Sequence, residues 1–220
     1  MAGLLIKGGQ VFSGADRSFR QRDVLIDGGK IARVDQTIEP DQTVEVIDAA
    51  GKLVSAGLID FHMHAFRYGH FLSVDTDDVA PSSGTTTFVD AGSAGSLHFL
   101  AFREYVIKPA RSRILAFFNI SAIGQTTDGV TGLGFHDCDD ERLLHVESAR
   151  ETIEKNREYI VGVKVRAYTN IPSMRAMERA RELADLVGLP IMVHTAPAPP
   201  TFEEVIAFLK PSDITTQSSP

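Results

Sequence analysis

The sequence has few of the features that mark secreted, membrane-spanning or nucleic-acid-binding proteins. Cys138 is its single cysteine, so an internal disulfide is excluded. No apolar run reaches the roughly 18 residues of a membrane-spanning helix, and Met1–Ile6 does not resemble the start of a secretory signal. The formal net charge is −7 and no long Lys/Arg run occurs, which argues against nucleic acid or an anionic membrane as a partner. We therefore expect a cytoplasmic protein.

The composition is that of an ordinary globular protein, with 43% hydrophobic and 23% charged residues in a chain of 220. Residues 1–54 contain three apolar runs separated by Gly-containing turns: GLLIKGGQVFS, RDVLIDGGKIARV and TVEVIDAAGKLV. Short apolar runs separated by such turns are typical of antiparallel strands. The sequence therefore predicts a small antiparallel β unit over residues 1–54.

From residue 55 to 220 the pattern changes to apolar strands that alternate with helices. The expected strands are GLIDFH, TTTFVDA, RILAFFNIS, YIVGVKVR and LPIMVHT, with a sixth beginning near Asp213. The expected helices are SLHFLAFREYVIKPA, ERLLHVESARETIEKNREY and PSMRAMERARELADLVG, the last opening at Pro172 and ending at Gly188. Continuously apolar strands separated by helices predict an α/β fold with a parallel sheet. The long connection Gly124–Asp140 follows the third of these strands, a position that often carries function.

Two histidines, His62 and His64, close the first strand of this second region in the segment LIDFHMH. Residues i and i+2 of a strand point to the same side, so the two imidazoles converge if the strand persists. For an isolated His-x-His, two unrelated loop histidines are the better interpretation. The position at the carboxyl end of a buried parallel strand favours a metal site instead, because such folds place their active sites there.

Two further residues follow the same pattern. His194 ends the strand LPIMV, and Lys164 lies among valines in YIVGVKV, where an unpaired ammonium is costly. Taken singly, a core or turn histidine and a surface-pointing lysine on an edge strand are the better interpretations. Together with the histidine pair, they place four metal-competent groups at three strand ends.

Several segments in order resemble one known family. SAGLIDFHMH, VDAGSAG, GVKVRAY and PIMVHTA are similar to the amidohydrolase superfamily of metal-dependent hydrolases, in its amidohydrolase/deacetylase, dihydroorotase-like branch. The resemblance implies a TIM (β/α)8-type barrel, of which residues 55–220 would form an incomplete part. It also implies that residues 1–54 are a β-sandwich-like unit, half of a composite sandwich domain.

The resemblance implies a site as well. His62 and His64 would bind one metal, a carboxylated Lys164 would bridge two, and His194 would bind the second. Two zinc ions are expected, with manganese, iron or cobalt as alternatives. The resemblance implies that such a centre acts on a small-molecule substrate and hydrolyses amides, cyclic amides or acyl and acetyl esters. Arg166, two residues beyond the lysine, is a candidate for clamping a substrate carboxylate, although an Arg paired elsewhere fits equally.

The sequence also departs from the family pattern. Gln217 stands where the resemblance expects a sixth-strand histidine, and the late-strand aspartate that would serve as general base has no counterpart. Residues 55–220 are also fewer than the roughly 200 of a compact (β/α)8 barrel. We therefore expect weak metal binding and impaired hydrolysis by this chain. An open sheet edge would also make a homo-oligomer plausible.

Two alternatives remain open from the sequence. One is a non-catalytic amidohydrolase-like subunit or binding module, a role that a missing general base permits. The other is a complete small α/β protein with incidental histidines, which requires Lys164 to be exposed to solvent.

Overall fold

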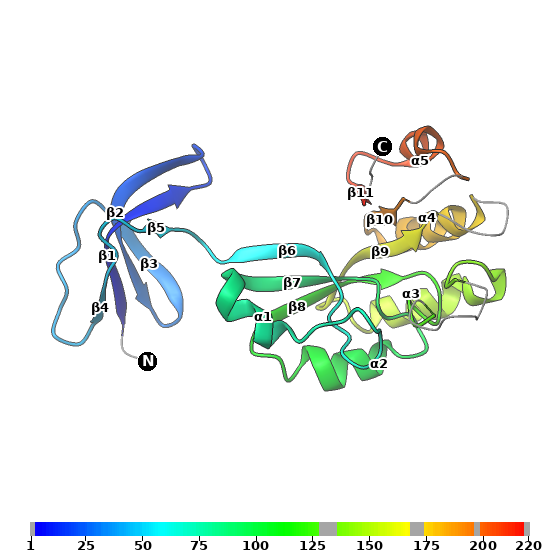
Figure 1. The fold of residues 1–220 in the computed structure, drawn as a ribbon, viewed down its shortest axis with the longest axis horizontal. Helices are drawn as coiled ribbons and strands as arrows, with labels where there is room; N and C mark the ends of the chain where they lie inside the picture. The colour runs from blue at the N-terminus through cyan, green and yellow to red at the C-terminus, as the bar shows by residue number, and fades with distance from the viewer. Residues whose placement is uncertain (1–2, 128–135, 168–173, 196–198, 218–220) are drawn as a thin grey trace. The chain divides into compact units, whose positions relative to one another are not determined.

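The structure is a computed structural model that describes residues 3–127, 136–167, 174–195 and 199–217 (Figure 1). Contacts divide the chain into two units, Met1–Gly57 and Leu58–Pro220. The expected helix start at Pro172 lies outside the described residues, as does the middle of the expected connection Gly124–Asp140.

The first unit is one mixed sheet with strand order β3-β2-β1-β4, to which β5 adds by pairing with β1. Its strands are β1 (Leu4–Ser13), β2 (Ser18–Asp27), β3 (Lys30–Asp35), β4 (Glu45–Asp48) and β5 (Leu53–Val54). Gly28 and Gly29 both have positive φ and close the β2–β3 hairpin, as the DGGK turn predicted. The expectation of a wholly antiparallel unit was wrong, because β4 and β5 run parallel to β1. The connection between β3 and β4 is long enough to carry the chain back to the end of the sheet where β3 begins, so β4 can run parallel to β1. A tight hairpin turn would instead make β4 antiparallel to β3.

The second unit contains a parallel sheet with strand order β11-β10-β9-β8-β7-β6, so each strand pairs with its neighbours in sequence. The strands are β6 (Leu58–Met63), β7 (Thr85–Ala91), β8 (Arg113–Asn119), β9 (Ile160–Arg166), β10 (Ile191–His194) and β11 (Ile214–Thr216). Helices connect successive strands (Figure 1). This confirms the predicted α/β fold, since parallel β/α units in sequential order form part of a (β/α)8 barrel.

The helices differ in regularity from those expected. They are α1 (Thr76–Ser83), α2 (Phe99–Phe102), the π-helical η1 (Arg103–Ile107), the 3-10 turn η2 (Glu141–Leu143), α3 (Val146–Glu154), α4 (Arg175–Val187) and α5 (Phe202–Phe208). The expected helix over residues 141–159 begins as η2 and restarts at α3, where the His145 side chain accepts a hydrogen bond from the Ser148 amide. α4 ends as predicted at Gly188, which adopts the left-handed conformation that favours glycine at this position.

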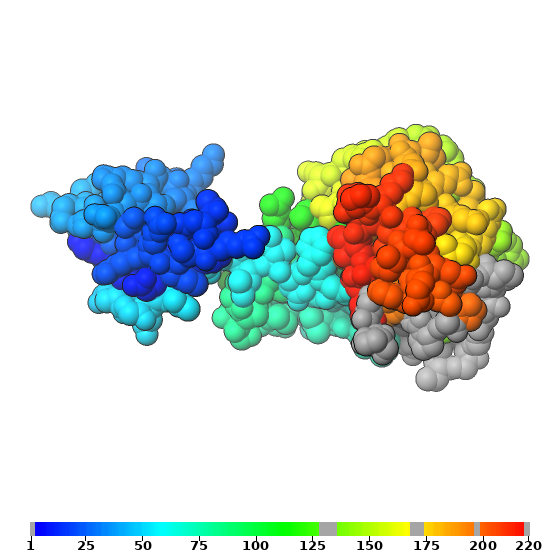
Figure 2. Space-filling model, turned by 90° about the horizontal axis from the view of Figure 1, so that it is seen from above, coloured from blue at the N-terminus to red at the C-terminus, as the bar shows by residue number. Residues whose placement is uncertain are grey.

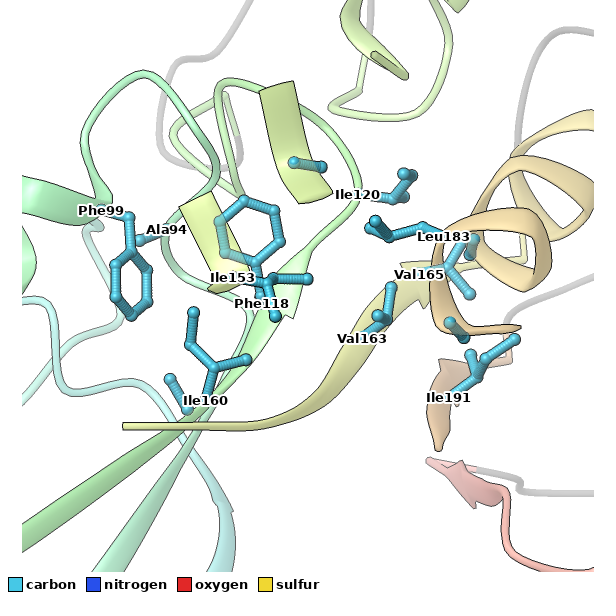
Figure 3. Packing of buried hydrophobic residues seen from close by; sticks show 14 of the residues in the cluster. Ala94, Phe99, Phe118, Ile120, Ile153, Ile160, Val163, Val165, Leu183 and Ile191 are labelled. Carbon is cyan, nitrogen blue, oxygen red and sulfur yellow. The ribbon is translucent and has the colours of Figure 1, made fainter. Parts of the chain in front are cut away.

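The two faces of the parallel sheet carry different residues. One face packs under the helices in a large apolar cluster that includes Val163, Val165, Ile191 and Leu183 (Figure 3). The opposite face holds a smaller cluster of Val89, Ala91, Phe117 and Met192. Because side chains alternate along a strand, Lys164 lies between two helix-facing valines and points to the second face.

The last described elements are fixed to α4. Figure 2 shows α5 and β11, in orange and red, beside the yellow α4 region. Arg181 of α4 forms an ion pair with the buried Asp213, and its guanidinium lies 5.8 Å from the centre of the Phe208 ring. Asp213 also accepts a hydrogen bond from the Ile191 amide at 2.8 Å, which joins the start of β10 to the start of β11. In the described ranges no helix combines the length and the apolar character that crossing a membrane requires.

Candidate metal centre

His62 and His64 come from the end of β6 and the residue that follows it. Their ring centres lie 6.0 Å apart at an interplanar angle of 84°. The pairing of β6 with β7 shifts register between Asp60 and Met63, so the strand is irregular where the histidines emerge. Both side chains are half-buried. The structure therefore places the two imidazoles side by side at the carboxyl edge of the sheet.

Lys164 is fully buried in β9. Its Nζ has no hydrogen-bond partner among the described residues. The side chain passes directly over Gly92, where an added Cβ would lie 2.4 Å from Lys164 Cγ. The burial of Lys164 contradicts the alternative of a small α/β protein with incidental histidines, which required an exposed lysine.

The electrostatics link Lys164 to the histidine pair. Burial, followed by the nearby Arg166 charge, lowers the pKa of Lys164 to about 7. Burial, followed by the Lys164 charge, lowers the pKa of His62 to about 4. His62 is therefore neutral at pH 7 and carries the lone pair that a metal ligand needs.

His194 and Arg166 lie on the same face as Lys164. In the β9–β10 register Lys164 is opposite Met192, and Arg166 is opposite His194. Residues in register in parallel strands, and residues two apart in one strand, share a face of the sheet. The structure thus brings the expected ligand residues of β9 and β10 to one face at the carboxyl edge.

Arg166 also takes part in a buried ion pair. Its Nε lies 2.9 Å from Oδ1 of Asp137, and both side chains are almost fully enclosed. Its Nη2 lies 3.3 Å from His136 Nδ1. Asn119 Nδ2 donates to the other Asp137 oxygen at 3.0 Å, which ties the described end of the long connection to the end of β8.

The donor set determines whether a metal fits. Across the described ranges no three side chains drawn from His, Cys, Asp and Glu form a metal-binding group. A centre at these strand ends therefore depends on a lysine-derived ligand, and the buried Nζ of Lys164 beside His62 is the group that could provide it. Imidazoles and a carbamate oxygen suit zinc, with manganese, iron and cobalt as alternatives. The donor types of His62, His64, His194 and a carboxylated Lys164 thus suit such a metal.

The sequence alone assigned no role to Asp90 and Ser93, which support His64. Asp90 is fully buried at the end of β7, and Ser93 follows in the next turn. Ser93 Oγ lies 2.8 Å from His64 Nδ1 and donates to Asp90 Oδ2 at 2.7 Å. The segment VDAGSAG places Asp and Ser at the end of an apolar strand, but this common pattern does not by itself indicate contact with His64.

His70, near the histidine pair, is a further residue to which the sequence assigned no role. It is buried, and its ring centre lies 4.4 Å from that of His64. The spacing His62, His64, His70 in the segment HMHAFRYGH gave a signal, but no strand or helix period connects the third histidine with the pair. The His64 ring is thus packed against the imidazole of His70.

Comparisons with known proteins show which family the chain resembles. The chain is 36% identical over 209 residues to "Deacetylase Atu3266" of Agrobacterium fabrum, an alignment that covers 92% of this chain and 50% of that protein. A crystal structure of a dihydroorotase superimposes with a TM-score of 0.82 at 31% identity, covering 98% of this chain and 57% of that one. The chain belongs to the amidohydrolase superfamily. It lies in the deacetylase and dihydroorotase-like part of that superfamily, as its sequence motifs predicted.

Other comparisons add a relative with a different name, the share of the relatives' length that this chain spans, and a match to a family model. A crystal structure of an adenine deaminase matches with a TM-score of 0.83 at 26% identity, so one amidohydrolase fold accommodates differently named enzymes. The chain spans about half the length of the curated relatives it matches. A family model described as a PUA-like domain matches residues 10–64, which include β2 to β6.

Proposed function

We propose that this amidohydrolase chain carries the metal-binding part of a hydrolase for amide, cyclic amide or acyl ester bonds. The proposed ligands are His62, His64, Lys164 and His194, and the proposed metal is zinc. Lys164 carries the proposal, because its amine is fully enclosed beside His62 with no hydrogen-bond partner in the described residues. A buried amine without a partner costs free energy, so its presence at this position favours a chemical role.

Carboxylation would give Lys164 that role. With a pKa of about 7, much of the amine is neutral at neutral pH. The nitrogen lone pair attacks the carbon of CO₂, an N–C bond forms, one C=O electron pair moves onto oxygen, and one N–H proton leaves to water. The product is an anionic carbamate whose two oxygens suit cations. Bound zinc would supply Lewis-acid polarisation of the scissile carbonyl.

Arg166 is the proposed contact for a substrate carboxylate, through the bidentate geometry that guanidinium groups offer. Asp137 holds its Nε and His136 lies beside its Nη2, so the plane of the guanidinium is fixed by its neighbours. A fixed guanidinium binds with less loss of side-chain entropy than a mobile one.

One residue favours a second candidate function, a non-catalytic subunit or binding module. Gln217 follows β11 at the position where the resemblance expects a histidine. A neutral amide oxygen is a weaker zinc ligand than imidazole, so we expect low zinc affinity and slow turnover in this chain. Hydrolysis assays on an N-acetyl amino acid, dihydroorotate and an acetyl ester, with zinc supplied, distinguish the two. Zinc-dependent hydrolysis supports the enzyme, and zinc binding without hydrolysis of any of them supports the binding module.

Zinc titration and carbamate detection test the centre itself. Zinc affinity measured against a competing chelator should fall at least tenfold in His62→Ala and Lys164→Ala. ¹³C-labelled bicarbonate should give a carbamate signal by NMR that disappears in Lys164→Ala. The control His145→Ser removes an imidazole at the α3 N-terminus while keeping a side chain that can cap the helix. Equal zinc affinity in the wild type, His62→Ala and Lys164→Ala would refute the proposed centre.

A further inference from the structure

We propose that Asp90 and Ser93 are positioning residues that hold the His64 imidazole with its proton on Nδ1, which makes Nε2 its ligating atom. The inference rests on the proposed metal centre, and it assigns the ligating nitrogen and the residues that select it. Three observations support it: the donors around Asp90, the single proton of the Ser93 hydroxyl, and the backbone that Asp90 also holds.

The Asp90 carboxylate is surrounded by hydrogen-bond donors. Oδ1 accepts from the amides of Gly92 at 3.0 Å and Ser93 at 2.7 Å, and Oδ2 accepts from the Ala65 amide at 2.8 Å and the Ser93 hydroxyl at 2.7 Å. Burial raises the pKa of Asp90, and these hydrogen bonds oppose that rise. A carboxylate surrounded only by donors acts as an acceptor with both oxygens. An asparagine there would turn an NH₂ group toward backbone N–H groups.

The Ser93 hydroxyl has one proton, and Asp90 Oδ2 accepts it. The same Oγ lies 2.8 Å from His64 Nδ1. With its proton committed, Ser93 Oγ can only accept from His64, so the imidazole must carry its proton on Nδ1. The lone pair of the neutral ring is then on Nε2. Metal-binding histidines commonly donate their other ring N–H to such a partner, which fixes the tautomer and the ring orientation.

Asp90 holds His64 from a second direction. Its Oδ2 accepts a hydrogen bond from the amide of Ala65, the residue directly after His64. One carboxylate therefore fixes both the backbone next to His64 and, through Ser93, the His64 ring. Its Oδ1 orders the turn of Gly92, the residue over which the Lys164 side chain passes. The buried Asp90 carboxylate on β7 therefore fixes His64, which directly follows β6. It also fixes the turn at Gly92, which the Lys164 side chain of β9 contacts.

The tautomer can be read directly in the full chain without metal. ¹⁵N-histidine labelling and long-range ¹H–¹⁵N correlation distinguish a protonated from an unprotonated ring nitrogen, and the His64 signals are assigned by their loss in His64→Gln. We expect a protonated Nδ1 in the wild type and in Ser93→Thr, which keeps the hydroxyl. Ser93→Ala should shift His64 toward the Nε2–H form. Ser96→Ala removes a hydroxyl three residues away that lies 3.2 Å from the Ser148 hydroxyl, and it should leave the His64 signals unchanged.

Zinc affinity is the second measurement. Ser93→Ala should weaken zinc binding about 10- to 100-fold, while Ser93→Thr and Ser96→Ala stay within about threefold of the wild type. A wild-type His64 protonated on Nε2 would overturn the inference, as would a Ser93→Ala variant with unchanged His64 signals. If the wild type binds no zinc, the proposed centre fails, yet the NMR comparison still decides whether Asp90 and Ser93 select the tautomer.

Discussion

Gly92→Ala is expected to be strongly destabilising, because two separate penalties act at this position. Gly92 has φ of +93°, in a region that L side chains rarely adopt, and such a conformation costs about 1–2 kcal/mol for a residue with a Cβ. The new Cβ would also lie 2.4 Å from Lys164 Cγ and 2.7 Å from Lys164 Cβ. Overpacking of a buried site costs about 1–3 kcal/mol. Together the loss in the free energy of unfolding should be about 2–5 kcal/mol.

Urea denaturation followed by circular dichroism measures this loss, with Gly188→Ala as the matched control. Gly188 has φ of +67°, and a Cβ added there would meet no heavy atom within 4 Å, so only the conformational penalty applies. The control should lose about 1–2 kcal/mol. The difference between the two variants isolates the contact with Lys164.

A double-mutant cycle tests that assignment. Lys164→Ala removes the Cγ but retains the Cβ, so Gly92→Ala should cost less in that background by about 1 kcal/mol or more. Equal losses for Gly92→Ala and Gly188→Ala, or an unchanged cost of Gly92→Ala in the Lys164→Ala background, would refute the reasoning that the turn is shaped around the lysine.

Three further predictions concern buried groups. The folded-state pKa of Lys164 is about 7 against an ordinary 10.5, so the unfolded chain binds more protons between these pH values and stability should rise with pH by up to about 1.4 kcal/mol per unit. Chemical denaturation between pH 7 and 9 should show this rise in the wild type relative to Lys164→Met, and parallel profiles would contradict it. Asp137→Ala leaves the buried Arg166 without its carboxylate partner and should cost about 3–5 kcal/mol in urea denaturation; a loss below about 1 kcal/mol would refute the importance of the pair. Burial and the neighbouring Asp137 raise the pKa of the Cys138 thiol, so a disulfide reagent at pH 8 should react with it only after unfolding, and rapid reaction in the native protein would count against its enclosure.

Much of the parallel sheet could be predicted because its strands carry a strong local signal. β7 runs over Thr85–Ala91 as the sequence indicated, and α4 ends at Gly188, where both periodicity and a glycine mark the boundary. Continuous apolar runs identify strands that are buried on both faces. The first unit was predicted less well, since a short apolar run specifies a strand but not the direction of its partner, and β4 pairs in parallel with β1.

The residues of the candidate site could likewise be predicted only in part. His62, His64, Lys164 and His194 could be selected because each is an unusual residue in or just after an apolar strand. Asp90 and Ser93 could not be assigned roles, because an Asp-x-x-Ser turn after a strand is common and only three-dimensional proximity links it to His64. The Asp137 pairing with Arg166 is equally invisible in the sequence, since the two residues meet through the return of a long connection to β9.

The sequential strand order also affects how such a fold can diversify. Each β/α unit docks onto the unit made just before it, so the peptide between two units can lengthen or shorten without rethreading the chain. Doubling a flexible connection costs only about 0.6 kcal/mol of closure entropy. Connections at the carboxyl edge can therefore change to suit new substrates, while the residues anchored in the strands keep their places.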